Sequence, residues 1–531
     1  MCSFDQCSYS ASSFGEVYIP QNAEFDKNSR FTAECPARSI NVDPDHPRLC
    51  SLEGVLFTKN GKTLLKYPSE KPGDVYVVPE GVEVIGSNAF SNTRLKAIFL
   101  PKSLKVIESH AFVGSKSLVI VTIQPGLKVI GNGAFKSCSQ LLTIIVPETV
   151  SRIEKCAFNA CSSLNLIVVD PNNKKYCSFE GALFTKDGKK LLKYPEGRTI
   201  ERYELPQTTT EIGAYALAGC KSTKTVALHK NVKRVGEGAF LACDSLESID
   251  VDPNNRKYRS VDGVLFSKDG NVLVYYPKGR KNEIYAVPEG VAVINAYAFS
   301  LCDSLKIVSL PRSVTVVGHS AFYGCEKIES FHLPKGVRFV GVCAFRDCKS
   351  LKSIRLPDDM KQLLWGAFAG CKSLRSIELP NGLKTIAAET FYGCANLKSI
   401  SLPKNASGIE SGAFFGCKSL KSIELPESLL RIGKGAFCNC ASLTSIKFPE
   451  STFVVGFVSF CGCKSLETVT IPKQTFFVAK DAFLNCPALT SIDVEPDNTH
   501  YQSIDGVLFK KDGTSLVKYP EGKQDYITSA I

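Results

Sequence analysis

The sequence predicts a repeat solenoid, because nearly the same string returns along the chain at a fixed period. GAFFGCKSLKSIELPESL begins at Gly412 and GAFCNCASLTSIKFPEST begins at Gly435. The Phe of each Ala-Phe-like pair recurs after 22 or 23 residues, as from Phe414 to Phe437, with two longer intervals of 59. A period of about 20 to 50 residues is typical of modules that cannot bury an apolar face alone and therefore stack on their neighbours.

Each unit contains a long and a short apolar segment. Apolar and polar residues alternate over 420–426, and Pro426 ends the run by removing a backbone donor, so we expect a strand. Units of constant length would pair these strands in parallel. Leu429 and Ile432 predict a shorter strand on the opposite side, and a tight, partly helical turn should follow over 436–440. The recurring apolar side chains would then fill one continuous interior.

Four hairpins accompany the repeats, at GVLFTKNGKTLLKYP from Gly54 and at related strings from Gly181, Gly263 and Gly506. Each has an Asn-Gly or Asp-Gly turn between two apolar runs. Three follow an acidic-Pro turn, at 170–173, 252–255 and 495–498. Side chains that bond their own backbone explain this composition, and a calcium loop is the alternative.

The repeats and hairpins together suggest a domain organisation. We expect an N-terminal segment and capping hairpin over 1–72 and a C-terminal hairpin and cap over 494–531. Between them, about fifteen units would form a solenoid over 73–493, with hairpin inserts near 170–205 and 252–287 that account for the two long intervals.

Composition indicates a soluble, well-packed chain, with 44% hydrophobic and 22% charged residues. The net charge of +12 favours anionic partners weakly, although a solubilising surface explains it as well. The N-terminus, MCSFDQCSYSASSFGEVYIP, has neither the basic nor the apolar region of a secretory signal. No run approaches the roughly 20 apolar residues that span a bilayer.

Thirteen Cys share one position, three residues after the repeat Phe. They are Cys138, Cys161, Cys220, Cys243, Cys302, Cys325, Cys348, Cys371, Cys394, Cys417, Cys440, Cys463 and Cys486. We interpret this column as buried filler with a weak S–H donor for the turn. Neighbours would lie about 5 Å apart, within disulfide range, but parallel side chains are poorly aimed at one another. We therefore expect free thiols, in a reducing compartment or a protected core.

The repeat I-G-x-x-A-F-x-x-C-x-S-L-x-S-I-x-L-P-x-x-L, present from Ile432 and Val340, resembles the BspA-like, or treponemal-type, leucine-rich repeat. The hairpins resemble inserts of that family. The resemblance implies a right-handed β-solenoid or horseshoe with a parallel concave sheet, short convex strands and helical turns. It also implies a surface protein that adheres to host cells or matrix proteins, without enzymatic activity or cofactors. Because no signal or anchor is recognisable, a cytoplasmic scaffold that uses the same concave face is the alternative.

The outward face of the main sheet is the first candidate site. By alternation, the later units place hydroxyl and charged side chains there, as at Ser399 and Ser401, whereas the early units place apolar ones. The candidate ligand-binding residues are Phe99, Ile120, Ile145, Leu166 and Val168. Such apolar side chains mark a protein-binding site or lie beneath another part of the chain, here the first hairpin and the N-terminal segment.

A basic edge along the later units is the second candidate site. It consists of Lys349, Lys352, Lys372, Arg375, Lys398, Lys418, Lys421 and Lys464. Sulfated glycans, acidic lipids and nucleic acid are all attracted by such charge. No aromatic residues interleave at base-stacking positions, which disfavours nucleic acid.

Catalytic and metal-binding patterns are weak in this sequence. The six His show no ligand-pair or catalytic spacing, so we expect no enzyme. Two Cys-x-Cys pairs, Cys438 with Cys440 and Cys461 with Cys463, could hold zinc or form a disulfide between Cys438 and Cys461. Since Cys440 and Cys463 belong to the inward column, packed thiols are the favoured interpretation, and we expect no metal.

Overall fold

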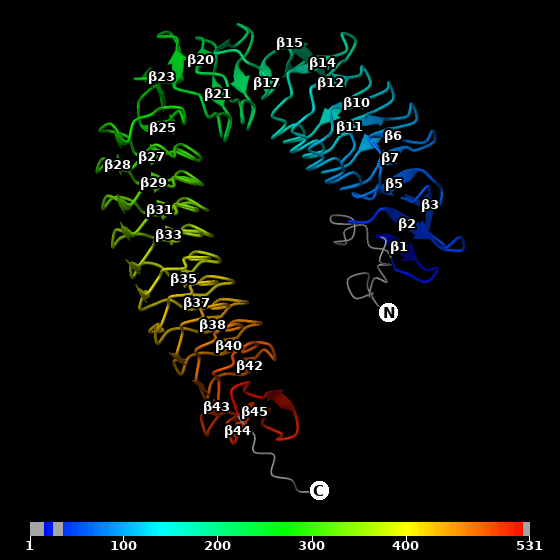
Figure 1. Cartoon of the computed structure of the whole chain (residues 1–531). Coiled ribbons are helices and arrows are strands. Elements are labelled where there is room, and N and C mark those ends of the chain that lie inside the picture. The colour runs from blue at the N-terminus through cyan, green and yellow to red at the C-terminus, as the bar shows by residue number, and fades with distance from the viewer. Residues whose placement is uncertain (1–14, 25–35, 524–531) are drawn as a thin grey trace. The chain divides into compact units, whose positions relative to one another are not determined.

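The computed structural model describes residues 15–24 and 36–523 and confirms the repeat solenoid. The chain divides into two compact units, Met1–Lys257 and Tyr258–Ile531. In each unit, successive coils contribute one main strand and one two-residue strand on opposite sides of a shared interior (Figure 1). The division falls inside the insert expected near 252–287, and the domain limits at 72 and 493 stay predictions.

The first unit begins with the parallel pair β1 (Glu16–Ile19) and β2 (Ser39–Val42). Its main strands are β6 (Val75–Val77), β8 (Ala97–Phe99), β10 (Ile120–Thr122), β12 (Thr143–Val146), β14 (Leu166–Val169), β18 (Arg202–Glu204), β20 (Thr225–Leu228) and β22 (Ser248–Val251). Its two-residue strands are β7 (Val84–Ile85), β9 (Val106–Ile107), β11 (Val129–Ile130), β13 (Arg152–Ile153), β19 (Glu211–Ile212) and β21 (Arg234–Val235).

The second unit repeats this plan. Its main strands are β26 (Ile284–Ala286), β28 (Ile307–Ser309), β30 (Ser330–His332), β32 (Ser353–Arg355), β34 (Ser376–Glu378), β36 (Ser399–Ser401), β39 (Ser445–Lys447), β41 (Thr468–Ile471) and β43 (Ser491–Val494). Its two-residue strands are β27 (Val293–Ile294), β29 (Val316–Val317), β31 (Phe339–Val340), β33 (Gln362–Leu363), β35 (Thr385–Ile386), β37 (Gly408–Ile409), β38 (Arg431–Ile432), β40 (Val454–Val455) and β42 (Phe477–Val478).

The main strands lie on the outer side of each unit's own curve, which corrects the concave main sheet implied by the resemblance. In Figure 1, β10 and β20 lie outside β11 and β21, and β28 lies outside β27 and β29. The hydrogen-bond ladders agree, because two-residue strands join ladders of five or seven strands whereas main strands form sheets of two or three. Bending a stack spreads the strands on its outer side. The ladder also breaks at 420–426, where the expected strand is not formed although Ile423 is buried.

In several coils, a glycine directly after the two-residue strand lets the coils approach closely on the inner side. A Cβ added to Gly341 would lie 2.6 Å from the backbone nitrogen of His319 in the preceding coil. At Gly236 the corresponding distance, to the nitrogen of Ala214, is 2.5 Å. Because any larger residue would push the coils apart here, these glycines favour the observed direction of curvature.

The repeat Phe side chains form buried rows of parallel rings. Phe345 stacks on Phe322 and Phe368 with ring centroids 5.1 and 5.6 Å apart and ring planes within 18° of parallel. The row runs unbroken from Phe299 to Phe483 in the second unit. Each offset stack contributes about 0.5–1.5 kcal/mol beyond the area it buries.

The Cys column is buried, and its thiols donate hydrogen bonds between coils. Cys371 Sγ donates to the carbonyl of Phe345, one coil earlier, at 3.1 Å. Ten other members make the equivalent bond at 3.0–3.2 Å: Cys138, Cys161, Cys243, Cys325, Cys348, Cys394, Cys417, Cys440, Cys463 and Cys486. All nineteen described cysteines are free thiols, as expected. Burial raises the pKa of Cys325 and Cys394 to about 12.

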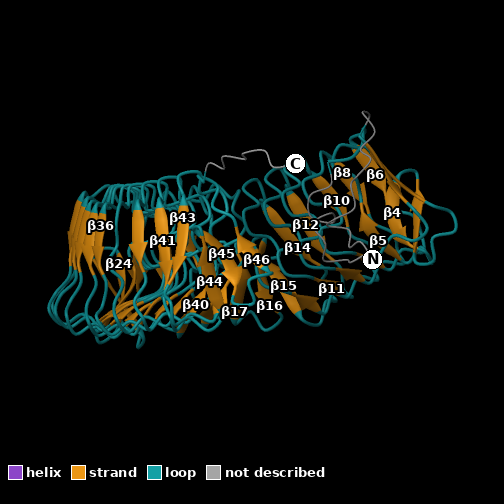
Figure 2. Cartoon of the chain, turned by 90° about the horizontal axis from the view of Figure 1, so that it is seen from below, coloured by secondary structure: helices purple, strands orange, loops and turns teal. Residues whose placement is uncertain are grey.

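The turn before each Cys is a hydrogen-bonded turn, and no helix is assigned among residues 15–24 and 36–523 (Figure 2). Cys440 N donates to Phe437 O at 3.1 Å, which closes one such turn. The preceding residue, Asn439, has a φ of 60°. A left-handed residue at this place ends the helical path after a single turn.

All four predicted hairpins are present, and each gains a third strand. The resulting meanders are β3 (Leu49–Leu52), β4 (Val55–Thr58) and β5 (Thr63–Lys66), then β15 (Tyr176–Phe179), β16 (Ala182–Thr185) and β17 (Lys190–Lys193), then β23 (Tyr258–Val261), β24 (Val264–Ser267) and β25 (Val272–Tyr275), and finally β44 (Tyr501–Ile504), β45 (Val507–Lys510) and β46 (Leu516–Lys518). In each of the first three meanders, the last strand forms a parallel pair with the next two-residue strand: β5 with β7, β17 with β19, and β25 with β27. Each of these meanders thus continues the ladder of two-residue strands.

The acidic-Pro turns hold the meanders through a buried Asn. Asn173 Nδ2 donates to the carbonyls of Pro147 and Val150 at 2.8 and 3.0 Å, and its Oδ1 accepts from two following amides. Asp170 Oδ1 accepts from the amide of Asn172. Asn255 and Asn498 make the same bonds to the preceding coil. The Asp and Asn side chains therefore accept hydrogen bonds from the backbone of their own turn, as the sequence suggested.

Candidate functional site

The structure places all five predicted ligand-binding residues at exposed positions on the main strands of the first unit. Two more apolar side chains, Val75 and Val77 of β6, are exposed beside them. We call the seven the apolar strip: Val75, Val77, Phe99, Ile120, Ile145, Leu166 and Val168. That these residues bind a ligand stays a prediction.

Strand register arranges the apolar strip in two columns. Val77 pairs with Phe99 and Ile145 pairs with Val168. In the other column, Val75 and Ile120 both pair with Ala97, from either side of β8. Since neighbouring parallel strands lie about 4.8 Å apart, side chains in a column can present one apolar surface.

Nothing in the described chain covers the apolar strip. Phe99 and Ile145 are 41% and 56% exposed with the first meander in place. The first hairpin, which belongs to this meander, therefore does not fold over them. The remaining part of the N-terminal segment, 1–14 and 25–35, lies outside the described residues.

The apolar strip ends at the second meander, β15–β17, which follows β14 in the first unit. The turn at Gly181 lies against Leu166, since a Cβ added to Gly181 would be 2.7 Å from a Leu166 methyl group. The next main strand, β18, is charged instead: Arg202 forms ion pairs with Glu204 and with Asp250. The apolar and charged stretches of the face are therefore sharply separated.

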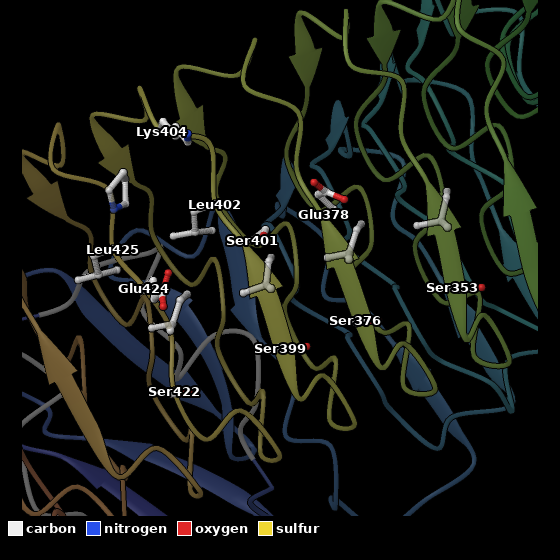
Figure 3. A pocket seen from close by; sticks show the side chains of 15 residues that line it. Ser353, Ser376, Glu378, Ser399, Ser401, Leu402, Lys404, Ser422, Glu424 and Leu425 are labelled. Carbon is white, nitrogen blue, oxygen red and sulfur yellow. The ribbon is translucent and has the colours of Figure 1, made fainter.

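The main-sheet face of the second unit is polar and hollowed over 353–426, whereas its first two main strands expose Ile284 and Ile307. A shallow cavity of about 780 Å³ lies over 353–426. Figure 3 shows Ser353, Ser376, Ser399 and Ser422 following one another on neighbouring coils, with Glu378 and Glu424 farther along. This hydroxyl-rich face matches the alternation of the sequence.

The eight residues of the basic edge are all exposed and belong to two positions of the coil. Lys349 and Lys352 are neutralised by Glu326 and Glu329 of the preceding coil, each at 2.6 Å. The other six form no ion pair within the described chain. The edge is therefore divided into a neutral part and a cationic part.

The Cys-x-Cys pairs do not converge on one centre. Cys440 and Cys463 donate inward to the carbonyls of Phe414 and Phe437, as members of the Cys column. Cys438 and Cys461 contact each other instead, and burial raises the pKa of Cys438 to about 11. Across the described ranges, no three His, Cys, Asp or Glu side chains form a metal-binding group.

Sequence reasoning missed several exposed apolar features. Ile284 and Ile307, which pair between β26 and β28, are 62% and 53% exposed at the start of the second unit's main-sheet face. Val75 and Val77 precede Phe90, the first repeat Phe, so the repeat period does not include their strand. Leu430, Phe453 and Phe476 form an exposed column beside the two-residue strands, with Phe453 N donating to Leu430 O and Phe476 N donating to Phe453 O. Their spacing of one period was the available signal.

The chain belongs to the BspA-type leucine-rich-repeat family. The family described as the BspA type leucine rich repeat region (6 copies) matches residues 75–184, 195–271, 278–398 and 384–512. No helix in the described part of the chain is long and apolar enough to cross a membrane. Comparison with curated proteins gives no match.

Several solved structures of bacterial proteins are similar to this chain. A leucine-rich repeat protein from Eubacterium ventriosum is 25% identical, with a TM-score of 0.46, over 67% of this chain and 84% of its own. A leucine rich cell surface protein from Faecalibacterium prausnitzii is 24% identical, with a TM-score of 0.38, over 72% and 96%. The leucine rich repeat protein of T. pallidum is 32% identical, with a TM-score of 0.31, over 36% and 90%. The family assignment rests on the repeat match.

Proposed function

We propose that the protein is a non-enzymatic adhesin that binds a host-cell or matrix protein through the apolar strip. The observation that carries this proposal is the exposure of seven apolar side chains on successive main strands of the first unit. A contiguous apolar patch on a soluble protein is typical of a protein-binding site. The leucine-rich-repeat assignment supports protein binding in general.

The adhesin and its alternative, an intracellular scaffold that uses the same face, differ in location. One similar protein is described as a cell surface protein. Labelling intact cells with a membrane-impermeant amine reagent separates the two. The adhesin predicts labelling of its exposed Lys residues, whereas protection of the whole chain until lysis would support the scaffold.

Binding through the apolar strip is tested by charge insertion. The triple variant F99K/I145K/V168K should lose binding to immobilised matrix proteins or host-cell membranes, because each Lys places a charge that must be desolvated in the interface. The control N132K/Q140K/Q207K adds the same charge at exposed polar positions of the same unit and should bind normally. Unchanged binding by the first variant, with folding verified by circular dichroism, would remove the apolar strip as the site.

A further inference from the structure

One column of charges in the second unit changes character along the stack. The residue directly before each main strand lies next to its counterpart in the following coil. The first four members, Glu283, Lys306, Glu329 and Lys352, alternate in sign. Lys306 Nζ lies 2.8 Å from Glu283, and Lys352 Nζ lies 2.6 Å from Glu329.

In the first unit, a Lys at the same position of the coil is also paired with a carboxylate of the preceding coil. There Lys96 pairs with Asp74 at 2.8 Å, and Lys224 pairs with Glu201 at 2.9 Å. A Lys at this place is thus normally matched by an acidic side chain one coil earlier. Matching is the expected arrangement, because exposed like charges at this spacing repel each other.

The alternation stops after Lys352. The next three members are Arg375, Lys398 and Lys421, which we call the cation column. Lys398 N donates to Arg375 O at 2.8 Å, which places the first two in adjacent coils. All three side chains are exposed, and none forms an ion pair with any described residue. Two further basic-edge residues, Lys372 and Lys418, add charge to the same coils.

A hydroxyl group follows each member of the cation column. Ser376, Ser399 and Ser422 come directly after Arg375, Lys398 and Lys421, and they line the shallow cavity of about 780 Å³ (Figure 3). The carboxylates of Glu378 and Glu424 line the same cavity two residues farther along the coil. Along each of these coils, a cation is therefore followed by a hydroxyl group one residue later and, in the coils of Glu378 and Glu424, by a carboxylate three residues later.

We propose that the cation column binds a linear sulfated polysaccharide whose sulfates contact Arg375, Lys398 and Lys421. The sugar hydroxyls are then free to bond Ser376, Ser399 and Ser422. Charge complementarity favours a polyanion, and the stack presents the cations at a fixed interval of about 5 Å. A single-stranded nucleic acid fits less well, because no aromatic side chain lines the cavity for base stacking.

The test measures the affinity of the full chain for heparin at several salt concentrations. R375S/K398S/K421S should bind at least tenfold more weakly, and the slope of log K against log salt should become shallower by roughly two to three. The control K128S/K136S/K155S removes the same charge from exposed positions of the first unit and should match the wild type. Desulfated heparin should not bind the wild-type protein.

A second variant separates binding from folding. K398E restores alternation of charge between Arg375 and Lys421, so it should raise the melting temperature at low salt while abolishing heparin binding. Equal loss of affinity in the control variant, or full affinity in R375S/K398S/K421S, would overturn the proposal. So would binding of the cation column to anionic phospholipid vesicles or single-stranded RNA without binding to heparin.

Discussion

Alkaline pH should unfold the second unit through its buried thiols. The folded pKa of Cys325 and Cys394 is about 12, above the ordinary value of 9.0, and burial is the main cause. The folded protein therefore keeps protons that the unfolded chain loses above pH 9, so stability is full below pH 9 and is lost as pH rises toward 12. Each such thiol costs about 1 kcal/mol between pH 9 and 10.

The magnitude follows from the number of thiols in the column. Burial also raises the pKa of Cys348, Cys371, Cys417 and Cys440 well above 9, so six consecutive coils respond together. Their sum, about 6 kcal/mol by pH 10, is comparable to the whole stability of many domains.

The assay is urea unfolding under reducing conditions at pH 7.5, 9 and 10, followed by circular dichroism. The urea midpoint should fall steeply above pH 9. Cys371→Ser should weaken this dependence by about one thiol's share, because a serine hydroxyl does not ionise in this range and can still donate to Phe345 O. Ser115, which donates to Phe90 O, shows that a hydroxyl can serve at this position. A midpoint unchanged between pH 7.5 and 10 would refute the reasoning.

Three further predictions concern packing, and a fourth concerns the thiols. Phe345→Ala should lower the unfolding free energy by about 3–5 kcal/mol in urea titrations, because Phe345 is buried. Phe99→Ala, in the exposed apolar strip, should change it by less than about 0.5 kcal/mol. Gly341→Ala should cost about 1–3 kcal/mol through coil separation, and Gly336→Ala, whose nearest atoms are 3.2 Å away, should cost less. Asn173→Ala should cost about 1–3 kcal/mol, against almost nothing for exposed Asn172→Ala, by thermal melting. Thiol titration without reductant should find the column unreactive in the native protein and all 22 Cys reactive after denaturation; a smaller count would reveal disulfides.

The period and the inward positions could be read from the sequence because each coil repeats one set of contacts. Phe345 and Cys371 keep their places through ring stacking and the thiol-to-carbonyl bond, both of which join neighbouring coils. The hairpins were also predictable from their Asn-Gly and Asp-Gly turns. Their third strands were not, because strings such as YCSF at 176–179 alternate weakly and precede the turn signal.

The direction of curvature could not be predicted from strand patterns. It depends on how closely neighbouring coils approach on each side, as at Gly236 and Gly341, where an added Cβ would lie 2.5 and 2.6 Å from the preceding coil. The apolar candidates of the first unit followed from alternation alone, since Phe99 and Ile145 flank the buried positions of their strands. The cation column needed the structure, because neutralisation of Lys352 by Glu329 becomes visible only when the coils are stacked.

Removal of one whole coil tests the stacking account most directly. Deletion of 412–434 removes 23 residues and joins Ser411 to Gly435, which continues the same pattern as Gly412. The account predicts a folded protein with an unchanged circular-dichroism spectrum per residue and a cooperative melt. Deletion of 412–423, about half a coil, should abolish folding of the second unit because every later side chain changes face. Equal loss of structure in both deletions would contradict the account.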